Sequence, residues 1–114
     1  MNFSVNAVAL AGARAALDAT DHMNALLDHT AKERQRLAQA LAGIGFEPLP
    51  SAANFLTVKT PKSAPAIAEA LAAENIFVLP FPWPGTPGAL RITIGSSADT
   101  DAVVAAIPRV LKAL

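Results

Sequence analysis

The sequence predicts an α/β (α+β) fold in which helices pack on a small mixed sheet of about three strands. Apolar residues recur at three- and four-residue steps in the alanine-rich first part, which favours helix. After Pro48 and Pro50 the period switches to two, which indicates strands. The 114 residues have the length of one domain, 1–114, with a helical linker region over 1–45 and the sheet and its helices over 46–114.

Composition excludes several classes of function. Nine basic residues balance nine acidic ones, so neither nucleic acid nor an anionic membrane is an expected partner. The absence of cysteine excludes disulfides and Cys-ligated zinc. The N-terminus has no basic segment ahead of an apolar one, and no stretch approaches the ~20 apolar residues of a membrane span. We therefore expect a cytoplasmic protein.

Two helices are predicted in the linker region. The first spans Val5–Leu17, with Ser4 as N-cap, and ends at the polar segment 18–21. Its expected buried residues are Val8, Leu10 and Leu17. Asp21 then caps a second helix that Gly43 and Gly45 end. The apolar stripe of this helix comprises Met23, Leu26, Leu27, Thr30, Leu37, Leu41 and Ile44.

The second predicted helix is long for so small a domain. It would extend roughly 34 Å, whereas the radius of gyration of a compact domain of this size is about 13 Å. Either the helix kinks near Thr30, or it is a strut that leans on a second body of protein.

Strands and helices alternate in the second part of the chain. A strand over residues 53–58 places Ala53, Phe55 and Thr57 on one face and Asn54, Leu56 and Val58 on the other. Ser63 caps a helix over Ala64–Ala73 whose first turn tolerates Pro65. Residues 76–79 form a short apolar strand.

A shaped loop, a strand and a helix complete the chain. The prolines of segment 80–88 prevent continuous pairing, and Trp83 within it is expected to be exposed apolar surface. Residues 90–95 alternate cleanly as a strand. Ser97 or Asp99 caps a last helix to Leu114, which Pro108 kinks or delays. Its expected inward residues are Val103, Ile107, Val110 and Leu111.

The histidines and lysines give little support for a metal site or a catalytic amine. His22 and His29 lie seven residues apart on one predicted helix, roughly 10 Å, too far to share a metal ion, so both are interpreted as solvated. The sequence contains no nucleophile elbow, Walker loop or dinucleotide fingerprint. The four lysines, Lys32, Lys59, Lys62 and Lys112, lie in helical or surface contexts that do not predict a Schiff-base amine.

Arg91 stands out because it lies in the middle of a predicted strand, between Leu90 and Ile92. One interpretation is an ordinary arginine on the solvent side of a half-buried strand. The other is a planar fork aimed at a carboxylate. The residues alone favour the first interpretation.

Five short motifs occur in order along the chain. They are Phe3-Ser4-Val5-Asn6, Glu33-Arg34, Pro50 to Leu56, Asn75 to Pro80 and Leu90 to Ser96. Together they resemble the C-terminal small domain of fold-type I pyridoxal-phosphate aminotransferases of class I/II, closest to the histidinol-phosphate aminotransferase group. The resemblance implies that Arg91 binds the substrate α-carboxylate, and that the long helix links the small domain to a large one.

The resemblance also implies parts that this chain lacks. The Schiff-base lysine, the aspartate facing the pyridine nitrogen and the phosphate-binding residues belong to the large domain, so we expect no cofactor on this chain alone. Histidinol-phosphate enzymes usually carry an arginine where this sequence has Leu79. We therefore expect Leu79 to line a side-chain pocket rather than to hold a phosphate, with Asn54 as a further substrate contact.

Two hypotheses of function follow. The first is the small domain, or a fragment, of an aminotransferase that acts on an amino acid and a 2-oxo acid, inactive alone and homo-oligomeric. The alternative is a free-standing α/β binding or assembly module that uses the Trp83 loop and the sheet face. The coding sequence upstream of Met1 would separate the two.

Overall fold

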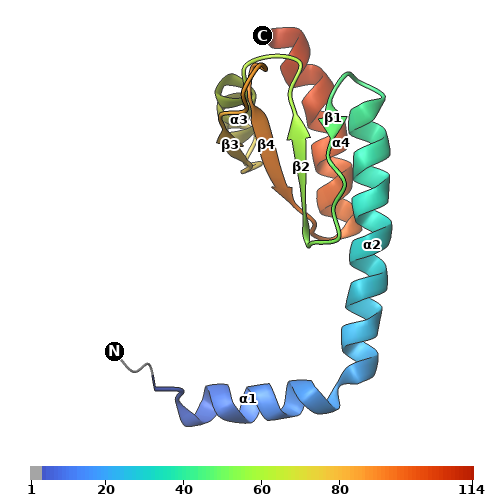
Figure 1. Cartoon of the computed structure of the whole chain (residues 1–114), viewed down its shortest axis with the longest axis vertical. Helices are drawn as coiled ribbons and strands as arrows, with labels where there is room; N and C mark the ends of the chain where they lie inside the picture. Colours follow the sequence, from blue (N-terminus) through green and yellow to red (C-terminus); the bar gives the residue numbers. More distant parts are fainter. Residues whose placement is uncertain (1–3) are drawn as a thin grey trace.

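The computed structural model describes residues 4–114, so Phe3 of the first motif lies outside the described residues. Four helices and four strands follow one another (Figure 1). They are α1 (Ala7–Asp18), α2 (Thr20–Ala42), β1 (Glu47–Pro48), β2 (Phe55–Lys59), α3 (Ala64–Ala73), β3 (Leu79–Phe81), β4 (Ala89–Thr93) and α4 (Ser97–Ala113). The predicted α/β (α+β) class is confirmed.

The sheet has the strand order β1-β2-β4-β3, and all three pairings are antiparallel. The prediction of a mixed sheet with about three strands was therefore wrong in strand direction and one strand short. The missed strand, β1, is only two residues long and contains Pro48. A proline is tolerated there because β1 lies at an edge of the sheet.

The predicted strand over residues 76–79 is displaced along the chain. The paired segment, β3, begins at Leu79 and continues through Pro80 to Phe81. Pro80 can occupy a strand because β3 is the other edge of the sheet. The next strand, β4, ends at Thr93 rather than at Gly95.

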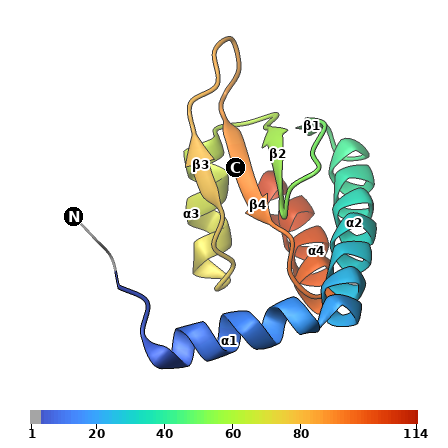
Figure 2. The ribbon, with the colours of Figure 1, turned by 60° about the horizontal axis from the view of Figure 1, so that its bottom comes forward.

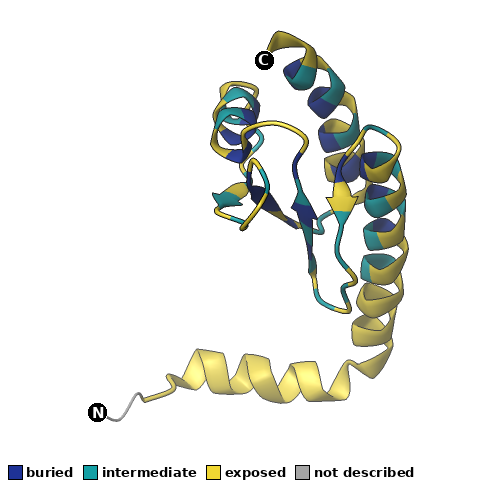
Figure 3. Cartoon of the chain, turned by 45° about the horizontal axis from the view of Figure 1, so that its top comes forward, coloured by how far each residue is buried: buried dark blue, intermediate teal, exposed yellow. Residues whose placement is uncertain are grey.

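Helices α2, α3 and α4 cover one face of the sheet, and the opposite face is open (Figures 2 and 3). Strand alternation explains this arrangement, because every second residue of β2 is buried and the others are half-buried. The core combines sheet residues Leu56, Val58, Leu90 and Ile92 with Leu37 and Leu41 of α2, Ile67 and Leu71 of α3, and Ile107 and Val110 of α4.

The N-terminal arm, formed by α1 and the exposed N-terminal half of α2, differs from the expectation. Asn6, not Ser4, caps α1, and its side chain accepts a hydrogen bond from the Ala9 amide at 2.8 Å. No residue of α1 is buried, so the predicted burial of its apolar side chains was wrong: Val8, Leu10 and Leu17 are 83%, 48% and 81% exposed. Asp21 lies in the first turn of α2 and does not cap it.

Helix α2 is one continuous helix that extends beyond the sheet and its covering helices (Figure 1). Its N-terminal half is exposed, whereas Glu33, Leu37 and Leu41 are buried. The radius of gyration, 17.1 Å, exceeds the compact value because of this arm. The helix runs through Thr30 without interruption, and a strut that leans on a second body of protein stays an expectation. Among residues 4–114, no helix is both long and apolar enough to cross a membrane.

The N-cap of helix α4 lies before both expected caps, Ser97 and Asp99. Ser96 is the N-cap, and Asp99 at the third helical position completes a capping box with it. The helix runs through Pro108 to Ala113, so the predicted late start was wrong. The expected inward residues Val103, Ile107 and Val110 are buried, and Leu111 is half-buried.

Candidate functional site

The open face of the sheet carries one row of side chains centred on Arg91. In the antiparallel register, Thr57 of β2 and Leu79 of β3 are the two Cα partners of Arg91 of β4. The three residues therefore stand side by side on the face that no helix covers. Sequence reasoning identified Arg91 and Leu79 separately, and the register brings them together.

Arg91 is held by an aromatic ring. Its guanidinium carbon lies 3.9 Å from the centroid of the Phe55 ring. Within residues 4–114, no ion pair or hydrogen bond engages the guanidinium. Lys59 of β2, another cation of the sheet, is paired with Glu47 at 2.7 Å and lies 5.9 Å from the centroid of the Trp83 ring. Arg91 therefore keeps its donors available for an external anion.

A shallow pocket of about 330 Å³ adjoins Arg91. Its lining residues are Phe77, Val78, Leu79, Arg91 and Thr93. One cation and one hydroxyl thus stand beside three apolar side chains, of which Leu79 is 56% exposed. This chemistry suits a ligand that combines a carboxylate with an apolar group.

Asn54 lies elsewhere. It lines a second pocket, of about 390 Å³, against the apolar residues Met23, Leu26 and Leu27 of α2. Its backbone carbonyl accepts a hydrogen bond from the Ile94 amide at 2.8 Å, and Arg34 donates to the neighbouring Ala53 carbonyl at 2.8 Å. The described structure therefore does not place Asn54 in the pocket of Arg91 and Leu79.

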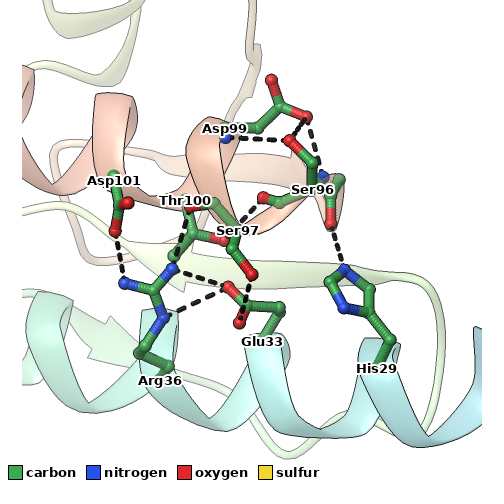
Figure 4. A network of polar contacts seen from close by, with 9 residues as sticks. His29, Glu33, Arg36, Ser96, Ser97, Asp99, Thr100 and Asp101 are labelled. Carbon is green, nitrogen blue, oxygen red and sulfur yellow. Dashed lines mark hydrogen bonds and ion pairs between the residues drawn. The ribbon is translucent and has the colours of Figure 1, made fainter.

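A polar network joins α2 to the start of α4 (Figure 4). Arg36 donates to Glu33 at 2.8 Å, to Asp101 at 2.6 Å and to the Ser97 carbonyl at 2.9 Å. The Ser97 hydroxyl donates to the other oxygen of Glu33 at 3.1 Å. Apart from the pair Arg36–Glu33, these contacts link residues more than sixty positions apart in the chain, so no local pattern in the sequence predicted them.

The network shifts the ionisation of its carboxylate. The pKa of Glu33 falls from 4.5 to about 2, first because Arg36 donates to it, then through the hydroxyls of Thr100 and Ser97, and burial opposes the fall. The pKa of Arg36 is raised by the hydrogen bonds to Glu33 and Asp101. Hydrogen bonds that favour the charged form explain both directions.

His29 belongs to the same region. Its Nε2 lies 2.9 Å from the Gly95 carbonyl, and the residue is half-buried. The interpretation of His29 as a solvated residue was therefore wrong, whereas His22 is exposed as expected. His29 fixes the turn between β4 and α4, so its role in the described structure is to position the backbone.

The surroundings of the four lysines can be compared with what a pyridoxal-phosphate site requires. Lys59 is engaged by Glu47, Lys62 donates to the Leu111 carbonyl at 2.8 Å, and Lys32 and Lys112 are exposed on helices. Covalent capture of the cofactor requires an amine inside a pocket that also holds the phosphate and the pyridine ring. None of these four environments fits that requirement.

Trp83 is half-buried rather than exposed. Its ring meets the Phe81 ring edge-on at 6.2 Å and covers Lys59. The loop therefore packs its tryptophan on the sheet of its own chain, and the expectation of an exposed Trp83 was wrong.

Comparison with known proteins gives the family. A family model of aminotransferase class I and II matches residues 1–107. Histidinol-phosphate aminotransferase 2 of Burkholderia lata is 39% identical over 111 residues, which cover 96% of this chain and 31% of the relative. Histidinol-phosphate aminotransferase 2 of Caulobacter vibrioides is 38% identical over 110 residues, which cover 96% of this chain and 29% of the relative.

The comparison with solved structures agrees with the comparison of sequences. The crystal structure of histidinol-phosphate aminotransferase from Sinorhizobium meliloti in complex with pyridoxal-5'-phosphate matches with a TM-score of 0.85 and 32% identity. The match covers 93% of this chain and 30% of that one. This chain thus spans about 30% of the length of the relatives that it matches. The chain therefore belongs to the aminotransferase class I and II family, whose model covers residues 1–107.

Proposed function

We propose that this chain is the C-terminal small domain of a cytoplasmic, pyridoxal-phosphate-dependent aminotransferase similar to histidinol-phosphate aminotransferases. Residues 46–114 would form the small domain proper, and residues 1–45 would link it to a large domain that binds the cofactor. The coverage of about 30% supports this proposal, because a larger partner domain accounts for the remaining length of the relatives. The chain alone would be inactive.

The observation that carries the proposal is the free guanidinium of Arg91 on the open sheet face. A guanidinium is planar and presents paired N–H donors, which match the two oxygens of a carboxylate. Arg91 would therefore hold the carboxylate of the amino acid or 2-oxo acid substrate.

Leu79 would contact the rest of the substrate. It lies directly opposite Arg91 and lines the same pocket, where it offers dispersion contact and no donor for a phosphate. An apolar or aromatic side chain suits this position better than a phosphorylated one. Asn54, which lines the separate pocket against α2, would contribute a secondary contact at most.

The test uses the complete aminotransferase that contains this chain. Arg91→Lys keeps the charge and removes the paired N–H donors of the planar guanidinium. The value of kcat/KM for amino acid substrates should therefore fall about ten- to a hundredfold, which corresponds to the loss of one charged hydrogen bond. Arg109→Lys is the matched control, because Arg109 is an exposed arginine of α4 that pairs with Glu74. Equal activity of Arg91→Lys and the control would refute the carboxylate role.

A free-standing assembly module remains the competing hypothesis, and the exposed apolar residues of α1 are the observation in its favour. An open reading frame upstream of Met1 that encodes a Schiff-base lysine would support the aminotransferase. A stop codon followed by an unrelated promoter would support the module.

A further inference from the structure

Phe55 and Arg91 occupy neighbouring rows of the open sheet face. Phe55 pairs with Thr93, and Arg91 pairs with Thr57, so the two side chains are diagonal neighbours across β2 and β4. Long side chains and aromatic rings reach one another across such a diagonal. The separation of 3.9 Å between the guanidinium carbon and the ring centroid places the cation against the face of the ring.

This contact differs from those of the other arginines near the sheet and its helices. Arg34 donates to the Ala53 carbonyl, Arg36 donates to two carboxylates and a carbonyl, and Arg109 donates to Glu74 and the Ala105 carbonyl. Each of these contacts consumes N–H donors. The ring of Phe55 holds Arg91 through the face of the guanidinium, so the donors along its edge stay free.

An arginine binds an anion best when its side chain is held in place and its N–H donors are still free. A free arginine side chain on an open surface samples many rotamers, and ordering it opposes ligand binding. An ion pair would restrict the rotamers but would also neutralise the charge. An aromatic platform restricts them and leaves the charge in place.

We propose that Phe55 is a positioning residue that orients the guanidinium of Arg91 toward a carboxylate ligand. The inference rests on the proposed role of Arg91 and adds the residue that makes this role effective. The backbone at Phe55 is anchored, because Phe55 lies in β2 and its carbonyl accepts a hydrogen bond from the Ser51 hydroxyl at 2.7 Å. The platform therefore belongs to the rigid sheet rather than to a loop.

The experiment uses the chain itself, with arginine labelled by ¹³C and ¹⁵N for NMR. Wild type should show Arg91 side-chain protons shifted upfield by the ring current, and titration with 4-methyl-2-oxopentanoate should move the same signals. Phe55→Leu should abolish the upfield shift and weaken the affinity for this 2-oxo acid about two- to fivefold, the range of an exposed cation–π contact. Phe55→Tyr keeps a ring and should keep both properties.

Two controls separate positioning from general stability. Phe81→Leu removes a ring from the same sheet face that contacts Trp83, so it should leave the Arg91 signals and the affinity unchanged. The methyl ester of the 2-oxo acid lacks the negative charge and should bind all variants equally weakly.

The outcomes distinguish this inference from the proposed function. If Arg91→Leu binds the 2-oxo acid as tightly as wild type, the carboxylate role itself is wrong, and the positioning role fails with it. If Arg91→Leu loses binding while Phe55→Leu keeps wild-type affinity, only the inference about Phe55 is overturned. A wild-type spectrum without the upfield shift would also overturn it, whether or not Phe55→Leu folds.

Discussion

Glu33 and Arg36, one turn apart on α2, form an ion pair of 2.8 Å in which the glutamate is only 3% exposed. The pair also reaches α4, where Ser97 donates its hydroxyl to Glu33 and Asp101 accepts from Arg36. A buried carboxylate requires such donors, because removing Arg36 would leave the charge of Glu33 unpaired and out of water. The network therefore fixes α4, and the end of β4 before it, to the long helix.

The first prediction concerns acid stability. The folded pKa of Glu33, about 2, lies below its ordinary value of 4.5, so the ionised carboxylate stabilises the fold above pH 4.5. This contribution is lost as the pH falls from about 4.5 to about 2. Glu33→Gln should be less stable than wild type at neutral pH, and the difference should shrink across this window. Urea unfolding at a series of pH values measures both.

Asp101→Asn provides the control, since Asp101 contacts the same arginine but its side chain is 68% exposed. It should lower the stability at neutral pH far less than Glu33→Gln does. Parallel stability curves for wild type and Glu33→Gln from neutral to acid pH would contradict the assignment of the shift to Glu33.

Arg91 and its neighbours show how far the sequence determines the site. The alternation of residues 90–95 was sufficient to place Arg91 on one face of a strand, and burial confirms that alternation. The partners of Arg91 could not be predicted, because they depend on the register of β2 and β3 against β4. Phe55 was placed on a strand face, but its contact with Arg91 required that register.

The wrong predictions for α1, Glu33 and β3 share a physical cause, because each depends on contacts between distant parts of the chain. An apolar stripe such as that of α1 indicates that a helix needs a partner, and it does not identify the partner. Glu33 has the appearance of a solvated helix residue until α4, more than sixty residues later, packs against it. The strand at Leu79–Phe81 was displaced in the prediction because Pro80 is acceptable only at an edge, and strand order is a property of the whole sheet.

The second prediction concerns Gly88, which has a φ of +131° at the end of the proline-rich loop. A Cβ there would lie 2.7 Å from the Cβ of Ala64, at the start of α3. Gly88→Ala should therefore lower the free energy of unfolding by about 2–4 kcal/mol, from backbone strain and overlap together. Gly85→Ala is the matched control, because its φ is +74° and its Cβ would meet nothing within 4 Å, so it should cost about 1 kcal/mol. Equal losses in urea unfolding would show that the overlap is relieved.

The third prediction concerns the cofactor. The isolated chain mixed with pyridoxal phosphate and reduced with borohydride should carry only low, scattered labelling over its lysines, because none lies in a pocket that would hold the phosphate. Intact mass and peptide mapping measure the labelling. Stoichiometric modification of a single lysine that disappears on heat denaturation would contradict the prediction.

The fourth prediction concerns association. Leu17 of α1 and Leu27 of α2 are 81% and 59% exposed on the N-terminal arm, and exposed apolar residues of this kind favour contact with a partner. The isolated chain should therefore form homo-oligomers at high concentration in sedimentation experiments. The double variant Leu17→Glu/Leu27→Glu should remain monomeric, whereas Leu114→Glu, at an exposed leucine far from the arm, should associate like wild type. A monomeric wild type at all concentrations would contradict the expectation.

The fifth prediction concerns substrate choice in the complete enzyme. Leu79 stands opposite Arg91 and lines its pocket with Phe77 and Val78, so no cation besides Arg91 lines this pocket among the described residues. Wild type should accordingly prefer apolar or aromatic amino acids to histidinol phosphate. Leu79→Arg adds a donor for phosphate, and one charged hydrogen bond should move the ratio of kcat/KM toward histidinol phosphate by about tenfold or more.

Leu79→Met separates charge from shape in this comparison, because it conserves side-chain volume and adds no donor. Its substrate preference should match that of wild type, whereas Leu79→Arg should also lose efficiency toward apolar amino acids, since the guanidinium displaces apolar contact. Efficient turnover of histidinol phosphate by wild type would mean that a cation from outside this chain reaches the pocket. In that case Leu79 would not determine the substrate, and the preference would be set by the large domain.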